Sequence, residues 1–288
     1  MLAYPVSEKP INWQLQRVYI QPKLDGVRCV IQANTKRHIL TPDLNEIEVK
    51  AYSRTGKEWK NIQHILDELR PFFFKHRDVV LDGELYNHDL RDDFEKIISL
   101  VRKQKPTEQD RSEASDLVQF HVYDVITEPN FTYEFRYNML TLQLPIATSM
   151  TLVKNTLVES YDEAEMLHKV HLAQGYEGSI LRLNEPYEQK RSYNLQKFKD
   201  FSDTEATIVG YEAGKGKFEG LIGKFLMQDD DGNKFGCPIG KGYDFAARKN
   251  ILNNIHDYMG KRATFTYFQR TNAGSYRHPL FKTIRNYE

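Results

Sequence analysis

The chain has 288 residues, of which 40% are hydrophobic and 28% charged, and this composition excludes a globally disordered, collagen-like or coiled-coil protein. Lysine plus arginine number 40, and aspartate plus glutamate also number 40, so the formal net charge is zero. A basic charge balance is typical of nucleic-acid binders, and the total charge here gives no such indication. It does not exclude a nucleic-acid partner either, because binding depends on where the charges lie.

Cysteine content and terminal hydropathy indicate the compartment. Cys29 and Cys237 form no C-x-x-C pair, which argues against a structural zinc site and against a disulfide framework. Residues 1–10 contain no apolar segment typical of a secretory signal, and no run approaches the roughly 20 apolar residues that a membrane helix needs. We expect a cytoplasmic protein without a membrane partner.

The length suggests about two domains, and the predicted elements change in character near residue 203. Before that point, strands are predicted at 17–23, 27–33, 47–53, 79–86, 118–126 and 178–183, and helices at 61–72, 92–102 and 162–174. They lack the regular alternation of a Rossmann sheet, so an α+β domain with antiparallel sheets is expected at residues 1–202.

The remaining 203–288 segment is rich in short strands and glycine. Strands are predicted at 206–211, 223–227, 234–238 and 262–268, with one helix at 245–258. Several strands and one helix in about 85 residues suggest a small β-barrel of the OB type. Barrels of this type commonly bind nucleic acids.

Four short motifs could carry chemistry, although each also fits an ordinary turn or strand end. The first motif is Lys23-Leu24-Asp25-Gly26-Val27-Arg28, which begins with a lysine at the end of a strand. A lysine becomes a nucleophile when desolvation or nearby cations favour its neutral amine. Carboxylates in Asp82-Gly83-Glu84 and at Glu177 could bind a ribose or a hard cation such as Mg²⁺. Two cations on one strand face, in Lys197-Phe198-Lys199, would suit a phosphate chain.

The order of these motifs is more informative than any one of them. Lys-x-Asp-Gly-x-Arg is followed by Ser53-Arg54-Thr55-Gly56, Asp82-Gly83-Glu84-Leu85, Tyr123-Asp124, a Glu-Gly-x-x-Leu-Arg segment at 177–182, and Lys-x-Lys at 197–199. This order resembles the covalent nucleotidyltransferase superfamily and, within it, the compact ATP-dependent DNA ligases of phages, large viruses and some bacteria. The segments at 240–244 and 277–285 are similar to an OB-domain loop and to the terminal strand of these ligases.

The resemblance implies a role for each matching residue. Lys23 would attack the α-phosphate of ATP and become a lysyl-AMP, with Mg²⁺ or Mn²⁺ as the cation. The residues implied in nucleotide binding are Gln21, Lys23, Arg28, Glu84, Tyr123, Lys197 and Lys199. Contacts to phosphates or to the nick are implied for Asp25, Arg28, Arg54, Arg182 and Arg285, and metal binding for Glu84 and Glu177.

Two positions depart from the family pattern. Gln21 lies where relatives often have a glutamate that reads adenine, and glutamine can also hydrogen-bond this base. Arg285 lacks the aspartate that follows it in larger ligases, which puts its role toward pyrophosphate in question. The 205–224 segment is too short for a long DNA clasp, so Lys215, Lys217 and Lys224 are expected to contact phosphates from the barrel itself.

The leading hypothesis is therefore a monomeric DNA ligase acting on nicked duplex DNA. An RNA ligase or an mRNA capping guanylyltransferase shares the Lys-x-Asp-Gly core and stays open as an alternative. A non-catalytic nucleic-acid-binding protein with a degenerate transferase domain is the second alternative. Residues 201–288 hold 13 basic and 10 acidic side chains, so the zero total conceals a net charge of +3 in the predicted barrel.

Overall fold

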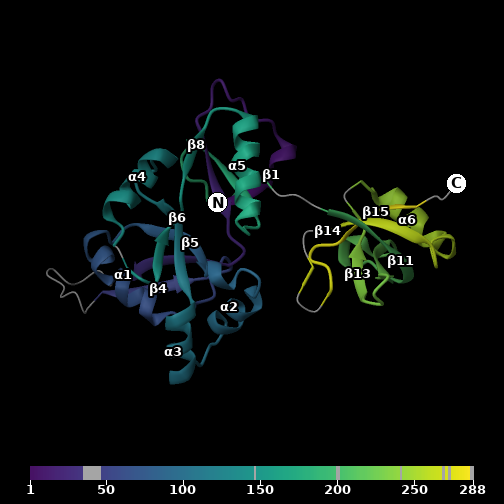
Figure 1. Cartoon of the computed structure of the whole chain (residues 1–288), viewed down its shortest axis with the longest axis horizontal. Helices are drawn as coiled ribbons and strands as arrows, with labels where there is room; N and C mark the ends of the chain where they lie inside the picture. Colours follow the sequence, from purple (N-terminus) through teal and green to yellow (C-terminus); the bar gives the residue numbers. More distant parts are fainter. Residues whose placement is uncertain are drawn as a thin grey trace. The chain divides into compact units, whose positions relative to one another are not determined.

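The structure is a computed structural model of the chain and describes residues 1–34, 47–145, 147–198, 202–240, 242–267, 270–271 and 274–285. Its contacts divide the chain into two compact units, Met1–Lys199 and Asp200–Glu288 (Figure 1). The functional boundary expected at residues 202 and 203 stays a prediction. Among the described residues, no helix combines the length and the apolar character that a membrane span requires.

The first unit contains two five-stranded sheets. The first sheet has the order β1 (Leu2–Pro5), β10 (Arg191–Phe198), β9 (Gly178–Leu183), β2 (Val18–Lys23) and β8 (Thr156–Val158). The second has the order β4 (Glu48–Tyr52), β3 (Val27–Asn34), β5 (Val80–Tyr86), β6 (Gln119–Ile126) and β7 (Met150–Leu152). Strands β1 and β10 pair in parallel, as do β6 and β7, while the other described pairs are antiparallel.

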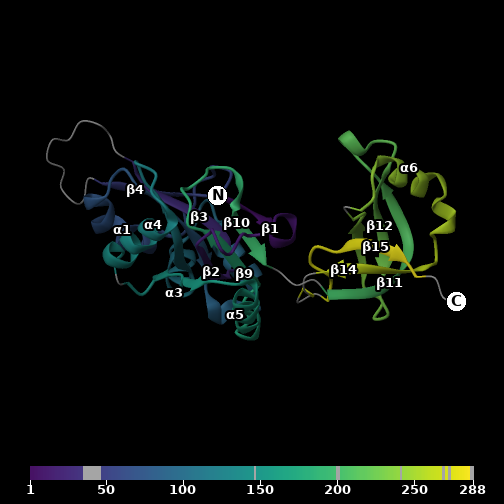
Figure 2. The ribbon, with the colours of Figure 1, turned by 90° about the horizontal axis from the view of Figure 1, so that it is seen from above.

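Helices cover both sheets through apolar faces. The core of the second sheet includes Ile65, Leu69 and Phe73 of α1 (Gln63–Lys75) and Leu100 of α2 (Phe94–Val101). Helices α3 (Glu108–Leu117) and α4 (Tyr133–Gln143) add Ala114 and Leu140 to it. The first sheet packs on α5 (Tyr161–Ala173), which both views of the ribbon show beside it (Figure 2).

The second unit is a five-stranded sheet in the order β13 (Lys234–Pro238), β12 (Ile222–Gln228), β11 (Ser202–Ala213), β14 (Arg262–Tyr267) and β15 (Leu280–Ile284). A parallel bridge between Ile239 and Phe281 brings its two outer strands together, as closure into a barrel requires. Ile208, Phe225, Phe265 and Phe281 lie in the core, and α6 (Phe245–Asn253) connects β13 to β14.

The expected α+β fold with a C-terminal OB-type barrel is confirmed. Two helices were not expected, α3 and α4. Helix α3 buries only Ala114, so its sequence lacks the apolar periodicity of an amphipathic helix. It begins instead on a capping box, in which Thr107 and Asp110 each accept a hydrogen bond from the other's backbone N–H.

Candidate active site

The turn that follows Lys23 crosses between the two sheets of the first unit. Strand β2 of the first sheet ends at Lys23, and β3 of the second sheet begins at Val27. A Cβ atom on Gly26 would lie 2.5 Å from the Leu85 carbonyl oxygen and 2.7 Å from Glu84 Cγ. Glycine therefore allows this turn to approach β5, and the approach places Lys23 beside the acidic segment.

Lys23 is held by Glu177. Its Nζ forms an ion pair with the Glu177 carboxylate, which is 5% exposed, whereas the lysine side chain is 22% exposed. The Glu177 N–H also donates to the Lys23 carbonyl oxygen at 3.1 Å. The proposed nucleophile and one proposed metal-binding glutamate, which are far apart in the sequence, are thus in direct contact.

A cavity of about 120 Å³ lies beside Lys23. Five of the predicted site residues line it: Gln21, Lys23, Glu84, Tyr123 and Arg182. Burial raises the pKa of Glu84 to about 8, although the Lys23 ammonium acts in the opposite direction. A bound cation would stabilise the ionised form of a carboxyl group in this environment.

The carboxylates near Lys23 can be compared with the ligands that a divalent cation requires. No group of three or more His, Cys, Asp or Glu side chains within the described ranges is arranged to hold an ion by itself. Mg²⁺, however, is usually held by only one or two carboxylates together with substrate phosphates. Glu84 and Glu177, which are electrostatically coupled to each other and to Lys23, fit that kind of site.

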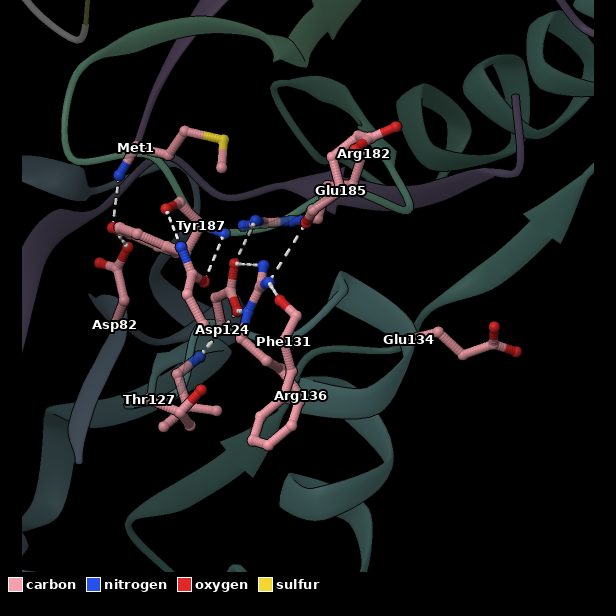
Figure 3. Close-up of polar contacts among 12 residues, drawn as sticks. Met1, Asp82, Asp124, Thr127, Phe131, Glu134, Arg136, Arg182, Glu185 and Tyr187 are labelled. Atoms are coloured by element: carbon pink, nitrogen blue, oxygen red, sulfur yellow. Dashed lines mark hydrogen bonds and ion pairs between the residues drawn. The ribbon is translucent and has the colours of Figure 1, made fainter. Parts of the chain in front are cut away.

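A buried ionic cluster joins Asp124 and Arg136 to Arg182, which lines the cavity (Figure 3). Asp124, which is fully buried, accepts hydrogen bonds from Arg136 Nε at 2.8 Å and Nη2 at 3.1 Å. It also accepts one from Arg182 Nη1 at 3.0 Å. The Nε of Arg182 donates to Gln21 Oε1 at 2.7 Å, so the cluster reaches a residue of the cavity wall.

The Arg182 side chain therefore makes its hydrogen bonds to other residues of the protein. Its guanidinium carbon lies 5.0 Å from the centre of the Tyr123 ring and 5.1 Å from that of Tyr133. The residue as a whole is 5% exposed. Contact of Arg182 with a nick phosphate stays a prediction, and the structure places its guanidinium in contact with Gln21 and Tyr123.

A second cluster joins Arg28, Asp82 and Tyr187. Arg28 donates to both carboxylate oxygens of Asp82, at 3.0 and 2.9 Å, and to the Tyr187 hydroxyl at 3.0 Å. Burial acts to lower the pKa of Arg28, but the Asp82 carboxylate, together with Tyr123 and Tyr187, raises this pKa by more than burial lowers it. Arg28 therefore keeps its positive charge in a half-buried place.

A second cavity lies beside this cluster. Arg28 and Tyr187 line it, together with Ser53 and Arg54 from the turn after β4, and Lys190 from the loop between β9 and β10. Asp82 lines the first cavity, so the Arg28–Asp82–Tyr187 cluster forms part of the wall between the two. The structure brings together Arg28 and Arg54, two residues predicted to bind phosphates.

The other predicted residues are not among those that line these two cavities. Lys197 pairs with Ile180 in β9, which pairs with Gln21, so Lys197 shares the sheet face of Gln21. Lys199 lies outside the described residues, and Asp25 lies in the turn after Lys23. In the second unit, Lys215 and Lys217 are exposed in the loop after β11, Lys224 pairs with Glu212, and Arg285 pairs with Glu205.

Asp82, which the sequence indicated as a possible ribose or cation ligand, instead binds Arg28 through both carboxylate oxygens. Two residues of the second cavity were not predicted. Tyr187 and Lys190 lie in a loop without any motif. The two histidines of α5, His168 and His171, lie where this helix packs on β9. His168 is 1% exposed, and both imidazoles approach the Ser179 hydroxyl, at 3.0 and 2.8 Å.

Comparison with known proteins identifies two family domains. Residues 1–199 match the ATP-dependent DNA ligase domain, and residues 213–285 match the DNA ligase OB-like domain. DNA ligase of Enterobacteria phage T6 is 26% identical over an alignment 310 positions long, which covers 91% of this chain and 62% of that protein. DNA ligase of Haemophilus influenzae is 25% identical over 293 residues, which cover 98% and 90% of the two chains.

A solved structure has a similar fold. A Lig E DNA ligase, described as DNA binding with a minimal scaffold, superposes with a TM-score of 0.75 at 24% identity and covers 99% of this chain and 98% of its own. The chain spans less than two thirds of the length of the phage relatives it matches.

Proposed function

Because the chain belongs to the ATP-dependent DNA ligase family, we propose that it seals nicks in duplex DNA through a covalent lysyl-AMP. The observation that carries this proposal is the position of Lys23, which lies at the mouth of a cavity lined by Gln21, Glu84 and Tyr123 and in contact with Glu177. Residues 1–202 would form the adenylating domain and residues 203–288 the OB domain.

In the first step the Lys23 amine attacks the α-phosphate of ATP. A P–N bond forms, the bond to the β-phosphate oxygen breaks, and pyrophosphate leaves. The ammonium must lose a proton before it attacks, and Glu177 is the carboxylate in contact with it. Tyr123 supplies an aromatic ring beside the base, where stacking is favourable.

The second cavity would serve the later steps. The 5′-phosphate of the nick attacks the lysyl-AMP phosphorus, which breaks the P–N bond, and the 3′-hydroxyl then displaces AMP and forms the phosphodiester. Arg28 and Arg54 would bind the 5′-phosphate, and Lys190, which lines the same cavity, would add a third cation. Phosphoryl transfer depends mainly on positioning and on charge neutralisation, which these side chains provide.

A divalent cation, Mg²⁺ or Mn²⁺, would be held by Glu84 and Glu177 with the substrate phosphates, and when bound it would neutralise phosphate charge. Nicked duplex DNA is the proposed partner of a monomer. Lys215 and Lys217 on the barrel unit would contact the phosphate backbone of the DNA. Lys197 and Lys199 would contact the phosphates of the nucleotide.

The proposal is tested with α-labelled nucleotides. The protein is incubated with labelled ATP or GTP and a divalent cation, and labelled protein is then offered nicked DNA or nicked RNA. Label from ATP and transfer to DNA are expected, and Lys23→Ala should abolish labelling while its circular dichroism spectrum is unchanged. Label from GTP would favour a capping enzyme, sealing of RNA alone an RNA ligase, and no label at all a non-catalytic protein.

A further inference from the structure

The carboxylate of Glu177 meets Lys23 from a position where strand alternation does not place it. Ser179, two positions later in β9, turns its hydroxyl toward α5, where the His171 imidazole lies 2.8 Å away. Regular alternation would turn Glu177 to the same side. Gly178 between them has a φ of 148°, a conformation that glycine permits and other residues rarely adopt. The direction of Glu177 therefore depends on what holds the residues beside it.

The residue before this glutamate, Tyr176, is held between two histidines. Its ring centre lies 4.4 Å from that of His88 and 6.0 Å from that of His171. Its backbone N–H donates to the His171 carbonyl oxygen at 3.0 Å. The ring also packs against the apolar cluster that contains Leu24, the residue after Lys23. One aromatic ring thus lies among the chain neighbours of both partners of the ion pair.

His88 supports this ring from the second sheet. It begins the short helix η3 (His88–Leu90), which follows β5, and its Nε2 lies 3.1 Å from the Gln174 carbonyl oxygen. Because a carbonyl oxygen only accepts, Nε2 carries a proton, and Nδ1 of the neutral ring accepts from the Tyr86 hydroxyl at 2.8 Å. Both ring nitrogens are used, which fixes the imidazole beside Tyr176.

Building on the proposed function, we propose that Tyr176 is a positioning residue which keeps Glu177 in contact with Lys23. His88 and His171 hold its ring, the first from the second sheet and the other from the helix that covers the first sheet. The geometry of the nucleophile then depends on both sheets at once. Without the ring, the segment before β9 is released and the carboxylate leaves the ammonium.

The first experiment measures the ion pair without any nucleotide. The protein is treated with a trace of acetic anhydride, and mass spectrometry gives the acetylation rate of Lys23 relative to that of the exposed Lys169. A carboxylate in contact stabilises the unreactive ammonium, so Glu177→Gln should raise this ratio by about threefold or more. Tyr176→Ala should raise it about equally. A ratio equal to that of the wild type in either variant would overturn the inference.

The second experiment asks whether the tyrosine acts through Glu177. Misplacement of a reacting group slows the chemical step, so Tyr176→Ala should lower the single-turnover rate of lysyl-AMP formation at saturating ATP about tenfold. The ATP concentration that gives half of this rate should change less than about threefold. In the Glu177→Gln background the same substitution should cost less than about twofold, because the contact is already lost. A further tenfold loss there would assign Tyr176 a purely structural role.

Three further variants exclude a general folding defect. Tyr176→Phe keeps the ring between the histidines and should behave as the wild type in both measurements, and a loss as large as that of Tyr176→Ala would count against the inference. His88→Ala removes one support of the ring and should act in the same direction as Tyr176→Ala. His76→Ala, which removes an imidazole that packs on Phe72 and lines neither cavity, should change neither measurement.

The proposed function is tested separately from this inference. Labelling of the wild type by ATP reports on the function, whereas the acetylation ratio needs no nucleotide and no catalysis. A protein that takes no label but shows the expected ratios would retain the positioning role of Tyr176 and lose the proposed activity.

Discussion

The Tyr187 hydroxyl donates a hydrogen bond to Asp82 Oδ2 at 2.6 Å, across 105 positions of sequence. Tyr187 belongs to the loop between β9 and β10 of the first sheet, and Asp82 belongs to β5 of the second. Because Asp82 also binds Arg28 through both oxygens, this contact orients the arginine that separates the two cavities. It links a residue outside every motif to the proposed phosphate site.

Replacing this tyrosine should affect DNA sealing more than adenylation. Tyr187→Phe removes the hydroxyl that Arg28 and Asp82 share, so single-turnover sealing of a pre-adenylated nick should slow about tenfold, while labelling of Lys23 by ATP changes less than threefold. The free energy of unfolding should fall by about 1 kcal/mol. Tyr161→Phe, on the exposed side of α5, is the matched control. An equal loss in labelling and sealing would assign Tyr187 a purely structural role.

A methyl group on Gly26 should displace the nucleophile. Because its Cβ would lie 2.5 Å from the Leu85 carbonyl, Gly26→Ala requires the turn to move away from β5. We expect labelling by ATP to fall at least a hundredfold, measured as the rate of lysyl-AMP formation. Gly242→Ala should keep the wild-type rate, because within the described part of the chain no atom beyond the adjacent residues lies within 4 Å of the added carbon. Normal labelling of the Gly26→Ala protein would show that the position of Lys23 does not depend on the close approach of this turn to β5.

The Asp124 cluster should dominate the stability of the first unit. Asp124→Asn leaves Arg136 and Arg182 buried with less compensation, and breaking a buried ion pair typically costs about 3–5 kcal/mol. Urea unfolding measures this loss. Asp67→Asn, which removes an exposed partner of Arg70, should cost less than about 1 kcal/mol. Similar losses of stability in the two variants would contradict the larger contribution expected of the buried Asp124 cluster.

Salt dependence tests the barrel lysines. If Lys215 and Lys217 each contact a DNA phosphate, each alanine substitution should reduce the slope of log K against log salt concentration by about 0.9. Fluorescence anisotropy with a nicked duplex at several salt concentrations gives the slope. Lys169→Ala on α5, where the lysine pairs with Glu165, serves as control. Slopes that match the wild type in both barrel variants would place these lysines outside the interface.

Acid should weaken the packing of α5 on β9. Burial, with His168 and Lys154, lowers the pKa of His171 from 6.5 to about 4, so the folded state keeps the imidazole neutral. Between these values the unfolded chain binds the extra proton, so stability is full above pH 6.5 and falls as the pH decreases toward 4. We expect a loss of about 1 kcal/mol between pH 7 and 5, after allowance for partial exposure. Unfolding of His171→Gln over the same range should show a flatter dependence, and an unchanged slope would exclude His171 as the source.

Much of the site was predictable because its residues lie in short ordered motifs. Lys23 and Gly26 share one turn, and the local alternation of β5 places Asp82 and Glu84 on one face. Alternation and turn residues also indicated the α+β unit and the barrel, since they report on local burial. Helix α3 escaped prediction because it buries little and depends on its cap.

The sequence by itself determined the order of the motifs, the residue types available for phosphoryl transfer and the excess of positive charge after residue 200. Only the tertiary structure decided which of these groups meet. It joined Lys23 to Glu177, Arg28 to Tyr187, and Gln21 through Arg182 to Asp124. Such contacts depend on how two sheets pack against each other, and the alternation along a single strand contains no information about its distant partner.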